Sequence, residues 1–446
     1  MQNLSRLVIS AVVMVAAMPL AVQAQEQATV PVISLDEAVT TALANNPAVS
    51  IARERVLRTQ AEVREAGALA LPQVSADAVY TRTDPVVVDF ADQRVTIVPA
   101  DSGSVTGRLT QAVDVFGRIR TAINLAEEQM RIQRLDLSRT ERGVIFDVKT
   151  AYFNVLRAMA QRDVAQAAVD VAEERARLAR VGFEAGTLAR FDVTSAEVQV
   201  AILRQRLIAA TNAIQVAQAA LANTMGMDVT REFAIEPIVP TVLEPEIAAD
   251  QAIETAYLAR PEVRIAQAVV DLQGLAVTLS EKERLPLIGL FGQLERNLNP
   301  GAFATAQTWR LGANVTWSIW AGGATQARIR QAESDLRAAE DSLQQARLGV
   351  GLDVQSSLVA LRDAYERMSA AEANVLLAEE ALRLAVVRYQ AGISTAVEVT
   401  AAEADLTQAR TDQVNALYDY ETALARFQRA TGTEPELQTV VQTEAS

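Results

Sequence analysis

Two copies of one turn contain the side chains of this sequence that are best placed to do chemistry. Residues 183–200 read FEAGTLARFDVTSAEVQV, and residues 389–406 read YQAGISTAVEVTAAEADL. Both follow the pattern aromatic, any residue, Ala-Gly, five residues, an acid and Val, at a constant offset of 206 residues. The acids, Asp192 and Glu398, can bond to a neighbouring helix or stabilise the start of their own helix.

The composition excludes most catalytic chemistry. The 446 residues contain no His and no Cys, which excludes thiolate sites, His-centred acid–base chemistry and most transition-metal sites. No pair of carboxylates is recognisable as part of a catalytic pocket. A net charge of −14 argues against a nucleic-acid partner. We therefore expect a protein that is not an enzyme, needs no cofactor or metal and does not bind nucleic acid.

The N-terminus, residues 1–24, has the pattern of a secretory signal peptide. Arg6 precedes the apolar run LVISAVVMVAAMPLAV, and Val22 and Ala24 form a small-x-small cleavage pattern. An uncleaved membrane anchor is the alternative, but the run is shorter than the ~20 apolar residues that a spanning helix needs. Since no Cys follows the cleavage site, we expect no lipid anchor.

The rest of the chain is an internal repeat. The segment SLDEAVTTALANNP (34–47) resembles ADQAIETAYLARP (249–261), and each half continues with alternating segments, a long helix, the Gly turn and a further helix. A Pro-rich linker separates the two halves. The expected organisation is a signal peptide over 1–24, a first repeat over 25–225, a linker over 226–249, a second repeat over 250–430 and a C-terminal tail over 431–446.

The helices of both halves have coiled-coil periodicity. After the first turn, apolar residues follow a 3-4-3-4 spacing from Val193 to Leu221, and small and large side chains alternate along this seam. The expected long helices, 118–182 and 322–388, would each span roughly 97–100 Å. The medium helices, 36–68 and 191–224, would span roughly 50 Å each, so two of them stacked end to end match one long helix. A simple coiled-coil scaffold is the alternative.

Between the helices, two pairs of segments alternate between apolar and polar residues. In residues 308–320, one face carries Trp309, Trp317 and four aliphatic residues, and the other is mostly polar. This is the pattern of a transmembrane β-strand, although a half-buried strand of a soluble sheet has the same pattern. The expected hairpins are 73–115 and 287–320, with outward loops at about 84–102 and 297–306.

The tryptophans of the second hairpin are expected at the membrane interfaces. Trp309 and Trp317 are eight residues apart, roughly 26 Å along a strand. That distance suits the two aromatic girdles of a membrane barrel. Trp320 is a third candidate for an interface position.

Four strands cannot close a barrel, and open sheet edges are not tolerated in lipid. Subunits must therefore pool their strands. A dimer would give eight strands and an interior filled by side chains, whereas a trimer would give twelve strands and a lumen. The polar face favours a wet pore and hence the trimer.

These features together resemble the outer-membrane efflux protein family, the TolC/OprM-like outer-membrane factors. The resemblance rests on the duplicated turns, on the strand-to-helix junctions DVFGRIR (114–120) and WAGG (320–323), and on the repeat itself. It covers nearly the whole chain after the signal peptide. The implied fold class is mainly α with a small transmembrane β part, namely long coiled-coil helical hairpins plus four strands per protomer that contribute to a shared 12-stranded barrel in a trimer.

The resemblance also implies a function and partners. A homotrimer of this family spans the outer membrane of a Gram-negative bacterium, contacts its lipid, and extends a helical tunnel into the periplasm. It passively conducts small molecules delivered by an inner-membrane pump and a periplasmic adaptor, the membrane fusion protein. The DVFGR junction is similar to members that serve pumps of the resistance–nodulation–division type. An exit duct of type I protein secretion and a soluble periplasmic coiled-coil scaffold are the alternatives.

The same resemblance implies the site residues. The two turns become periplasmic tips that contact the adaptor, with Ala185, Gly186, Thr187, Ala391, Gly392 and Ile393 at the matching positions. Asp192, Tyr389 and Glu398 match residues that close the periplasmic end. The chain departs from the family at two gate positions, where Ser394 and Ala401 stand. Local turn geometry and stabilisation of helix N-termini are the alternative roles.

Overall fold

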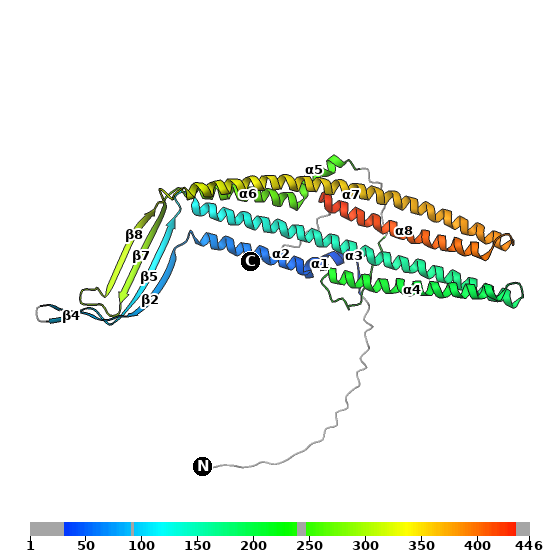
Figure 1. The fold of residues 1–446 in the computed structure, drawn as a ribbon, viewed down its shortest axis with the longest axis horizontal. Coiled ribbons are helices and arrows are strands. Elements are labelled where there is room, and N and C mark those ends of the chain that lie inside the picture. The colour runs from blue at the N-terminus through cyan, green and yellow to red at the C-terminus, as the bar shows by residue number, and fades with distance from the viewer. Residues whose placement is uncertain (1–30, 91–92, 239–246, 434–446) are drawn as a thin grey trace, which may run out of the picture.

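The computed structural model describes residues 31–90, 93–238 and 247–433 and shows an elongated molecule with a small sheet at one end (Figure 1). The predicted signal peptide, part of the predicted linker and most of the predicted tail lie outside these residues. The first half contains β1 (Val32–Ile33), α1 (Leu35–Asn45), α2 (Pro47–Ala68), β2 (Gln73–Arg82), β3 (Val86–Phe90), β4 (Gln93–Val98), β5 (Asp101–Val113), α3 (Arg118–Glu184) and α4 (Arg190–Thr224). The second half contains β6 (Ala234–Ile235), α5 (Ala249–Ala259), α6 (Pro261–Lys282), β7 (Leu287–Asn297), β8 (Gln307–Thr316), α7 (Ala324–Gln390) and α8 (Ala396–Thr431).

The helices of the two halves match in length and arrangement. Helices α3 and α7 are both 67 residues long, about 100 Å at 1.5 Å per residue. Helices α2 and α4 follow one another along α3, and α6 and α8 do the same along α7. Each half is therefore a wall two helices wide, as the helix lengths predict. Among the described helices, none is apolar over a stretch long enough to cross a bilayer.

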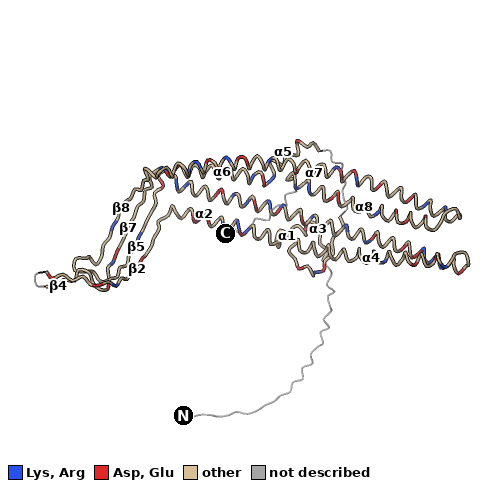
Figure 2. Tube along the Cα trace, viewed as in Figure 1, with Lys and Arg blue, Asp and Glu red and all other residues tan. Residues whose placement is uncertain are grey.

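The coiled-coil seam predicted in α4 is confirmed. Val200 and Leu203 of the seam are buried against Val169, Ala172 and Ala176 of α3. Along the helices, basic and acidic residues are interspersed over the whole length, whereas the strands carry fewer of them (Figure 2). Small residues in the seam let the paired helices approach closely, as in knobs-into-holes packing.

The medium helix expected over 36–68 is interrupted. The backbone of Asn46 is extended, with φ −66° and ψ 125°. The ring of Pro47 disfavours the helical conformation for the residue before it. Pro47 then begins α2, and the Asn46 side chain accepts a hydrogen bond from the Ala48 N–H at 2.8 Å. Arg260 and Pro261 make the same break between α5 and α6.

A hydrogen bond joins each break to the C-terminal end of the helix that lies next to it in the same column, α4 in the first half and α8 in the second. The Asn46 amide donates to the carbonyl of Thr224, at the end of α4, at 2.8 Å. In the second half the Arg260 guanidinium donates to the carbonyl of Ala430, near the end of α8, at 3.4 Å. The two helices of each column therefore meet end to end at the waist of the molecule.

The four long strands form one antiparallel sheet in the order β2-β5-β7-β8. Pairing of β5 with β7 joins the two halves, from Ser104 opposite Asn297 to Val113 opposite Ile288. Strands β2 and β8 are the outer strands, and neither has a second partner among the described residues. The sheet thus ends in two open edges.

Two sequence expectations for this region were wrong in detail. The segment 84–102, expected as a loop, contains the additional hairpin β3–β4, in which a run of three valines (86–88) pairs with Val95–Val98. The last strand ends at Thr316 rather than at residue 320, because Trp317 turns to donate its indole N–H to the carbonyl of Arg284 at 3.0 Å. Trp320 therefore lies in the strand-to-helix junction.

The junction motif DVFGRIR caps α3. The Asp114 carboxylate accepts hydrogen bonds from the N–H groups of Ile119 at 3.0 Å and Arg120 at 2.8 Å. These N–H groups lie in the first turn, where no helical carbonyl is available to them. Lys282, at the end of α6, donates to the Gly117 carbonyl at 2.9 Å and fixes the junction against the second half.

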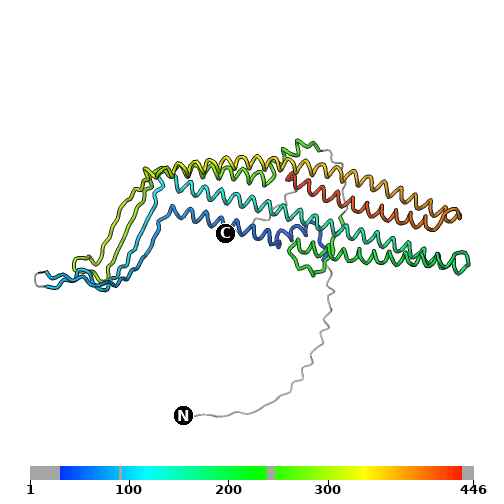
Figure 3. Tube along the Cα trace, viewed as in Figure 1, coloured from blue at the N-terminus to red at the C-terminus, as the bar shows by residue number. Residues whose placement is uncertain are grey.

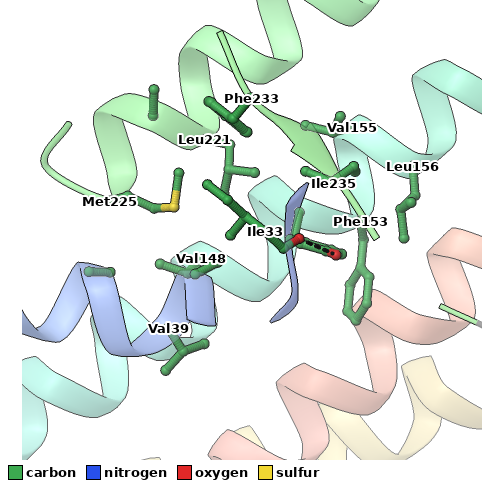
Figure 4. Close-up of a cluster of buried hydrophobic side chains, with 14 of the residues drawn as sticks. Ile33, Val39, Val148, Phe153, Val155, Leu156, Leu221, Met225, Phe233 and Ile235 are labelled. Atoms are coloured by element: carbon green, nitrogen blue, oxygen red, sulfur yellow. Dashed lines mark hydrogen bonds between the residues drawn. The ribbon is translucent and has the colours of Figure 1, made fainter. Parts of the chain in front are cut away.

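The largest core lies at the waist (Figure 4), where α1, α3, α4 and the parallel pair β1–β6 meet. Tyr152 is fully buried there, and its hydroxyl lies 3.1 Å from the Ile33 carbonyl and 2.7 Å from the Glu236 carbonyl. Burial raises the pKa of Tyr152 to about 12. A second core is formed by α5, α7 and α8 around Leu358 and Leu361. The two halves lie side by side over this waist (Figure 3), and α3 packs against α8.

Candidate functional site

The two repeated turns lie together at the end of the molecule opposite the sheet. In the first, the Gly186 N–H donates to the Phe183 carbonyl at 2.9 Å and the Thr187 N–H to the Gly182 carbonyl at 2.8 Å. In the second, Gly392 bonds in the same way to Tyr389, at 3.0 Å, and the Ile393 N–H donates to the Arg388 carbonyl, also at 3.0 Å. Both turns are therefore Schellman motifs of identical pattern.

The glycines of these turns are required by backbone geometry. Gly186 has φ 76° and Gly392 has φ 73°, in the left-handed region that other residues avoid. No atom lies within 4 Å of a Cβ placed on either glycine, so the requirement is conformational and not steric crowding. Ala185 and Ala391 precede them as the C-caps of α3 and α7.

The two predicted gate carboxylates stabilise the helices that follow the turns. The Asp192 carboxylate accepts from the Ala189 N–H at 3.0 Å, in the first turn of α4. The equivalent Glu398 accepts from the Ser394 hydroxyl at 2.7 Å, in the first turn of α8. The Ser394 hydroxyl, and to a lesser degree Arg388 at 3.9 Å, hold the pKa of Glu398 below its usual value. Ser394, one of the two departures from the family pattern, thus has a local role.

Tyr389, the third predicted gate residue, is not bonded to Asp192 within the described part of the protomer. Its backbone carbonyl accepts in the turn, and its side chain is partly exposed. The three residues do lie at the same end of the molecule, on or beside the two turns.

The sequence analysis missed a polar contact between the two helical hairpins. Arg175 of α3 donates to the Glu403 carboxylate at 2.6 Å and to the Thr400 hydroxyl at 2.9 Å, both on α8. The side chains of Arg175 and Glu403 are 23% and 21% exposed, so water screens their attraction only partly. Burial raises the pKa of Glu403, and the charge of Arg175 opposes this shift.

This contact ends a row of bonds along the α3–α8 interface, in which every donor belongs to α3. The donors are Arg142, Lys149, Arg157, Gln161 and Arg175, and their acceptors are Gly432, Gln428, Asp419, Asn415 and Glu403. The row could not be found from sequence, because it pairs helices from different halves in antiparallel register. It holds the two hairpins together from the waist to the tips.

The repeat predicts other ion pairs that the structure makes twice. Glu173 pairs with Arg204 at 2.6 Å, and their equivalents Glu379 and Arg410 pair at 2.9 Å. Glu403 breaks the symmetry, because its equivalent, Glu197, pairs within its own hairpin with Arg180 at 2.8 Å. Residue 386, the equivalent of Arg180, is a valine, so Glu403 has no such partner in its own hairpin. Glu403 thus pairs across the hairpins, whereas Glu197 pairs within its own.

The predicted interface tryptophans lie at the two ends of the sheet. Trp309 of β8 is 75% exposed and lies near the loop end of the strand. Trp317 and Trp320 are 57% and 83% exposed and lie near the helices. No group of His, Cys, Asp or Glu that could hold a metal occurs in the described residues.

Comparison with known proteins assigns this architecture to one family. A family model described as outer membrane efflux protein matches residues 38–227 and 252–433, so it covers both halves. The outer membrane protein TolC of Vibrio cholerae is 24% identical over 397 residues, which are 87% of this chain and 88% of TolC. The pyoverdine export outer membrane protein OpmQ of Pseudomonas aeruginosa is 25% identical over 414 residues, 89% of this chain and 83% of OpmQ. The crystal structure of the outer membrane protein VceC of Vibrio cholerae superposes with a TM-score of 0.75 at 19% identity, over 89% of this chain and 96% of VceC.

Proposed function

Since the chain belongs to the outer membrane efflux protein family, we propose that it is the trimeric exit duct of a tripartite export system. Its relatives are outer-membrane channels and not enzymes, and the protein is an outer-membrane protein of a Gram-negative bacterium. The duct conducts small molecules passively from an inner-membrane pump and a periplasmic adaptor to the exterior. The energy for transport comes from the pump.

The main support for a trimer is the pair of open edges of the sheet. Strands β2 and β8 each lack a second partner in the described chain, and an unpaired edge is costly in lipid. When β8 of one protomer pairs with β2 of the next, three protomers close a barrel of twelve strands. Such a barrel is wide enough for a wet lumen, whereas an eight-stranded barrel fills with side chains.

The helical walls continue this barrel as a tunnel. Each protomer contributes four columns of helix, so a trimer has twelve columns and six tips around one opening. The identical Schellman turns support a ring of nearly equivalent tips, at which the adaptor docks. The docking positions are Ala185, Gly186, Thr187, Ala391, Gly392 and Ile393.

The tips also form the gate. Asp192, Tyr389 and Glu398 lie around the opening, where repeated carboxylates repel anions and slow leakage. The Arg175–Glu403 bond supports closure, because it holds the two hairpins of one protomer together. Opening separates the hairpins, and adaptor binding favours the separated state.

The β part lies in the outer membrane, with its apolar face on lipid. Trp309 is placed at the outer interface, and Trp317 and Trp320 at the periplasmic interface, where aromatic residues gather in membrane barrels. The pump is of the resistance–nodulation–division type, a choice that rests on the DVFGR junction alone. The name of the relative OpmQ, a pyoverdine export protein, supports a small-molecule cargo over a secreted protein.

The test is fractionation of the processed protein followed by mass determination in detergent. We expect it in the outer-membrane fraction, with a particle mass of three chains. Conductance of the purified particle in a planar bilayer then tests the duct. A soluble periplasmic protein would contradict the membrane barrel and favour the coiled-coil scaffold, and a dimer mass would contradict the twelve-stranded closure.

A further inference from the structure

The charged residues on the polar face of the sheet fall on two adjacent rungs. The register places Asp77, Thr106, Glu295 and Thr308 side by side across the four strands. The next rung toward the helices contains Ser75, Arg108, Gln293 and Arg310. No other charged residue of β2, β5, β7 or β8 lies on this face.

The two signs are separated by rung and by strand. The carboxylates lie on the first strand of each hairpin, β2 and β7, and the guanidiniums on the second, β5 and β8. Two residues along a strand correspond to about 7 Å, so the rungs are within reach of each other's side chains. Arg310 and Glu295 lie 3.6 Å apart across the two rungs.

On β7, one of the two central strands, the charged part of the polar face is more enclosed than the opposite face. On β7, Gln293 and Glu295 are partly buried, whereas Leu290 and Leu294 on the opposite face are exposed. Arg296 lies on that opposite face, since it is paired with Val105. The charge on Arg296 therefore projects to the other side of the sheet from Glu295, one residue away.

Closure of the barrel places these rungs around the lumen, a step that rests on the trimer proposed above. Repetition of the order β2-β5-β7-β8 places an acid on every first strand and an arginine on every second strand. Three protomers give six carboxylates and six guanidiniums around the lumen. Because the strands are tilted, the two sets are staggered along the axis and form one belt, within which they are called here the acidic ring and the basic ring. Twelve strands about 4.8 Å apart and tilted by about 40° form a cylinder of roughly 12 Å backbone radius.

We propose that Asp77, Glu295, Arg108 and Arg310 form a charge-balanced cluster in the lumen of the barrel, called here the ion filter. Its balance of charge sets the ratio of cation to anion permeability close to one in the barrel. Each ring lies within about one Debye length of the axis at 0.1 M salt, so an unbalanced ring would act on every ion that passes. In the native protein the rings neutralise each other, and the barrel favours neither cations nor anions. The arginines keep the carboxylates from making the exit cation-selective.

The test is the ratio of potassium to chloride permeability, measured from the reversal potential of the trimer in a planar bilayer under a KCl gradient. Arg108→Gln with Arg310→Gln should raise the ratio roughly threefold or more, since a ring of like charge changes the local potential by at least about one kT. Asp77→Asn with Glu295→Gln should lower it. The variant with all four substitutions should return close to the native ratio.

Arg296→Gln is the matched control, because it removes the same charge from the same sheet, on β7, but on the other face. It should leave the ratio unchanged. The effect of the arginine pair should also shrink in 1 M salt, where the Debye length falls to about 3 Å. The filter would be overturned if Arg296→Gln changed the permeability ratio as much as the arginine pair does. It would also be overturned if the arginine pair left the ratio unchanged in a conducting trimer. Either result would leave the proposed duct intact.

Each variant is recorded with the native tip and with Arg175→Met, which is expected to open the tip because it removes both bonds of Arg175 to α8. Absence of conductance in both backgrounds would overturn the proposed duct itself and the filter with it. If a charge variant does not assemble, Thr106→Cys in this cysteine-free chain provides a second route. Its modification by a cationic and by an anionic thiol reagent should shift the ratio in opposite directions, whereas Gly107→Cys on the other face should not respond.

Discussion

At the scale of single residues, two arginines of α3 make different kinds of ion pair, one between the two helical hairpins and one within the first hairpin. Arg175 and Arg180 are five residues apart, and each pairs with one of the two repeat-equivalent glutamates. Arg180 bonds to Glu197 of its own hairpin, whereas Arg175 bonds to Glu403 of the other. Only the second bond must break when the hairpins separate.

We therefore expect Arg175→Met to open the tips. It removes both bonds to α8 and leaves Glu403 partly buried without its cation, at a cost of about 1–2 kcal/mol. That corresponds to a roughly 5- to 30-fold larger open population. The measurement is open probability in a planar bilayer, with entry of a large antibiotic into cells as a second readout.

Arg180→Met is the control, since it removes the same side chain from the same helix. It should leave the open probability near the native value, and equal leakage of the two variants would show that the cross-hairpin bond does not matter.

The leakage of Arg175→Met should also depend on pH. Burial raises the pKa of Glu403 in the closed state, so Glu403 takes up a proton more readily there than when it is exposed in the open state. Leakage of Arg175→Met should hence decrease as the pH falls through that raised pKa.

The sequence identifies the turns but not the bonds between hairpins. Gly186 and Gly392 are recognisable because a repeated Ala-Gly fits one backbone geometry, which depends only on neighbouring residues. The partner of Arg175 depends on how two halves pack, and no local pattern contains that information. Asp192 and Glu398 were predicted as gate residues, and their bonds within the protomer are those of helix N-termini.

At the scale of elements, the strand-to-helix junctions fix the direction in which each long helix leaves the sheet. Asp114 bonds to two N–H groups of the first turn of α3, and Lys282 bonds to the carbonyl of Gly117 beside it. The motif DVFGRIR is therefore a helix cap whose acid is supplied by the end of the strand. Its physical role explains why an acid and a glycine occur at this spacing.

Asp114→Ala should loosen this junction. Loss of a helix cap costs about 0.5–2 kcal/mol, and the cost should be local. We expect faster amide hydrogen exchange over the first turn of α3, residues 118–121, with no change at the waist. Asp114→Asn keeps one acceptor and should restore part of the protection. Unchanged exchange in the alanine variant would mean that Asp114 is not the cap.

Sequence periodicity predicted the long helices and the four long strands of the sheet, and it failed where two signals compete. The break at Asn46 was missed because the apolar spacing continues across it, although Pro47 disfavours a helical residue before it. The β3–β4 hairpin was missed because the valine run of β3 (86–88) does not alternate with polar residues, so no pair of alternating strands was visible. The end of β8 was missed because Trp317 continues the alternation after the backbone has left the sheet.

At the scale of the whole molecule, one cluster at the waist connects the break between α5 and α6 to α7 and to the end of α8. Arg260 is 9% exposed and bonds to Glu262 at 3.0 Å and to Asp353 of α7 at 2.5 Å. Burial alone would raise the pKa of Glu262, but the bonds from Arg260 outweigh this effect and lower it. The cluster therefore depends on ionised carboxylates.

Arg260→Met should destabilise the protein at pH 7 by roughly 2–4 kcal/mol, below the full value for a buried pair because the carboxylates are partly exposed. The lowered pKa of Glu262 gives stability that is present above its unfolded value of 4.5 and is lost as the pH falls through the folded value. The difference in melting temperature between native and variant protein should thus be largest near neutral pH and narrow below pH 4.5. Arg177→Met, at an exposed pair, should show little difference at any pH.

The end-to-end joints at the waist also have an electrical consequence. Helix α4 runs from the tip to the waist and α2 continues from the waist to the sheet, so their peptide dipoles point the same way along one column. Helix α3 beside them points the opposite way, and α8, α6 and α7 repeat the arrangement. Neighbouring columns of similar length therefore cancel one another. A solute moving along the axis would meet little net field from the peptide backbone, and the field that it does meet comes from side chains at a few levels.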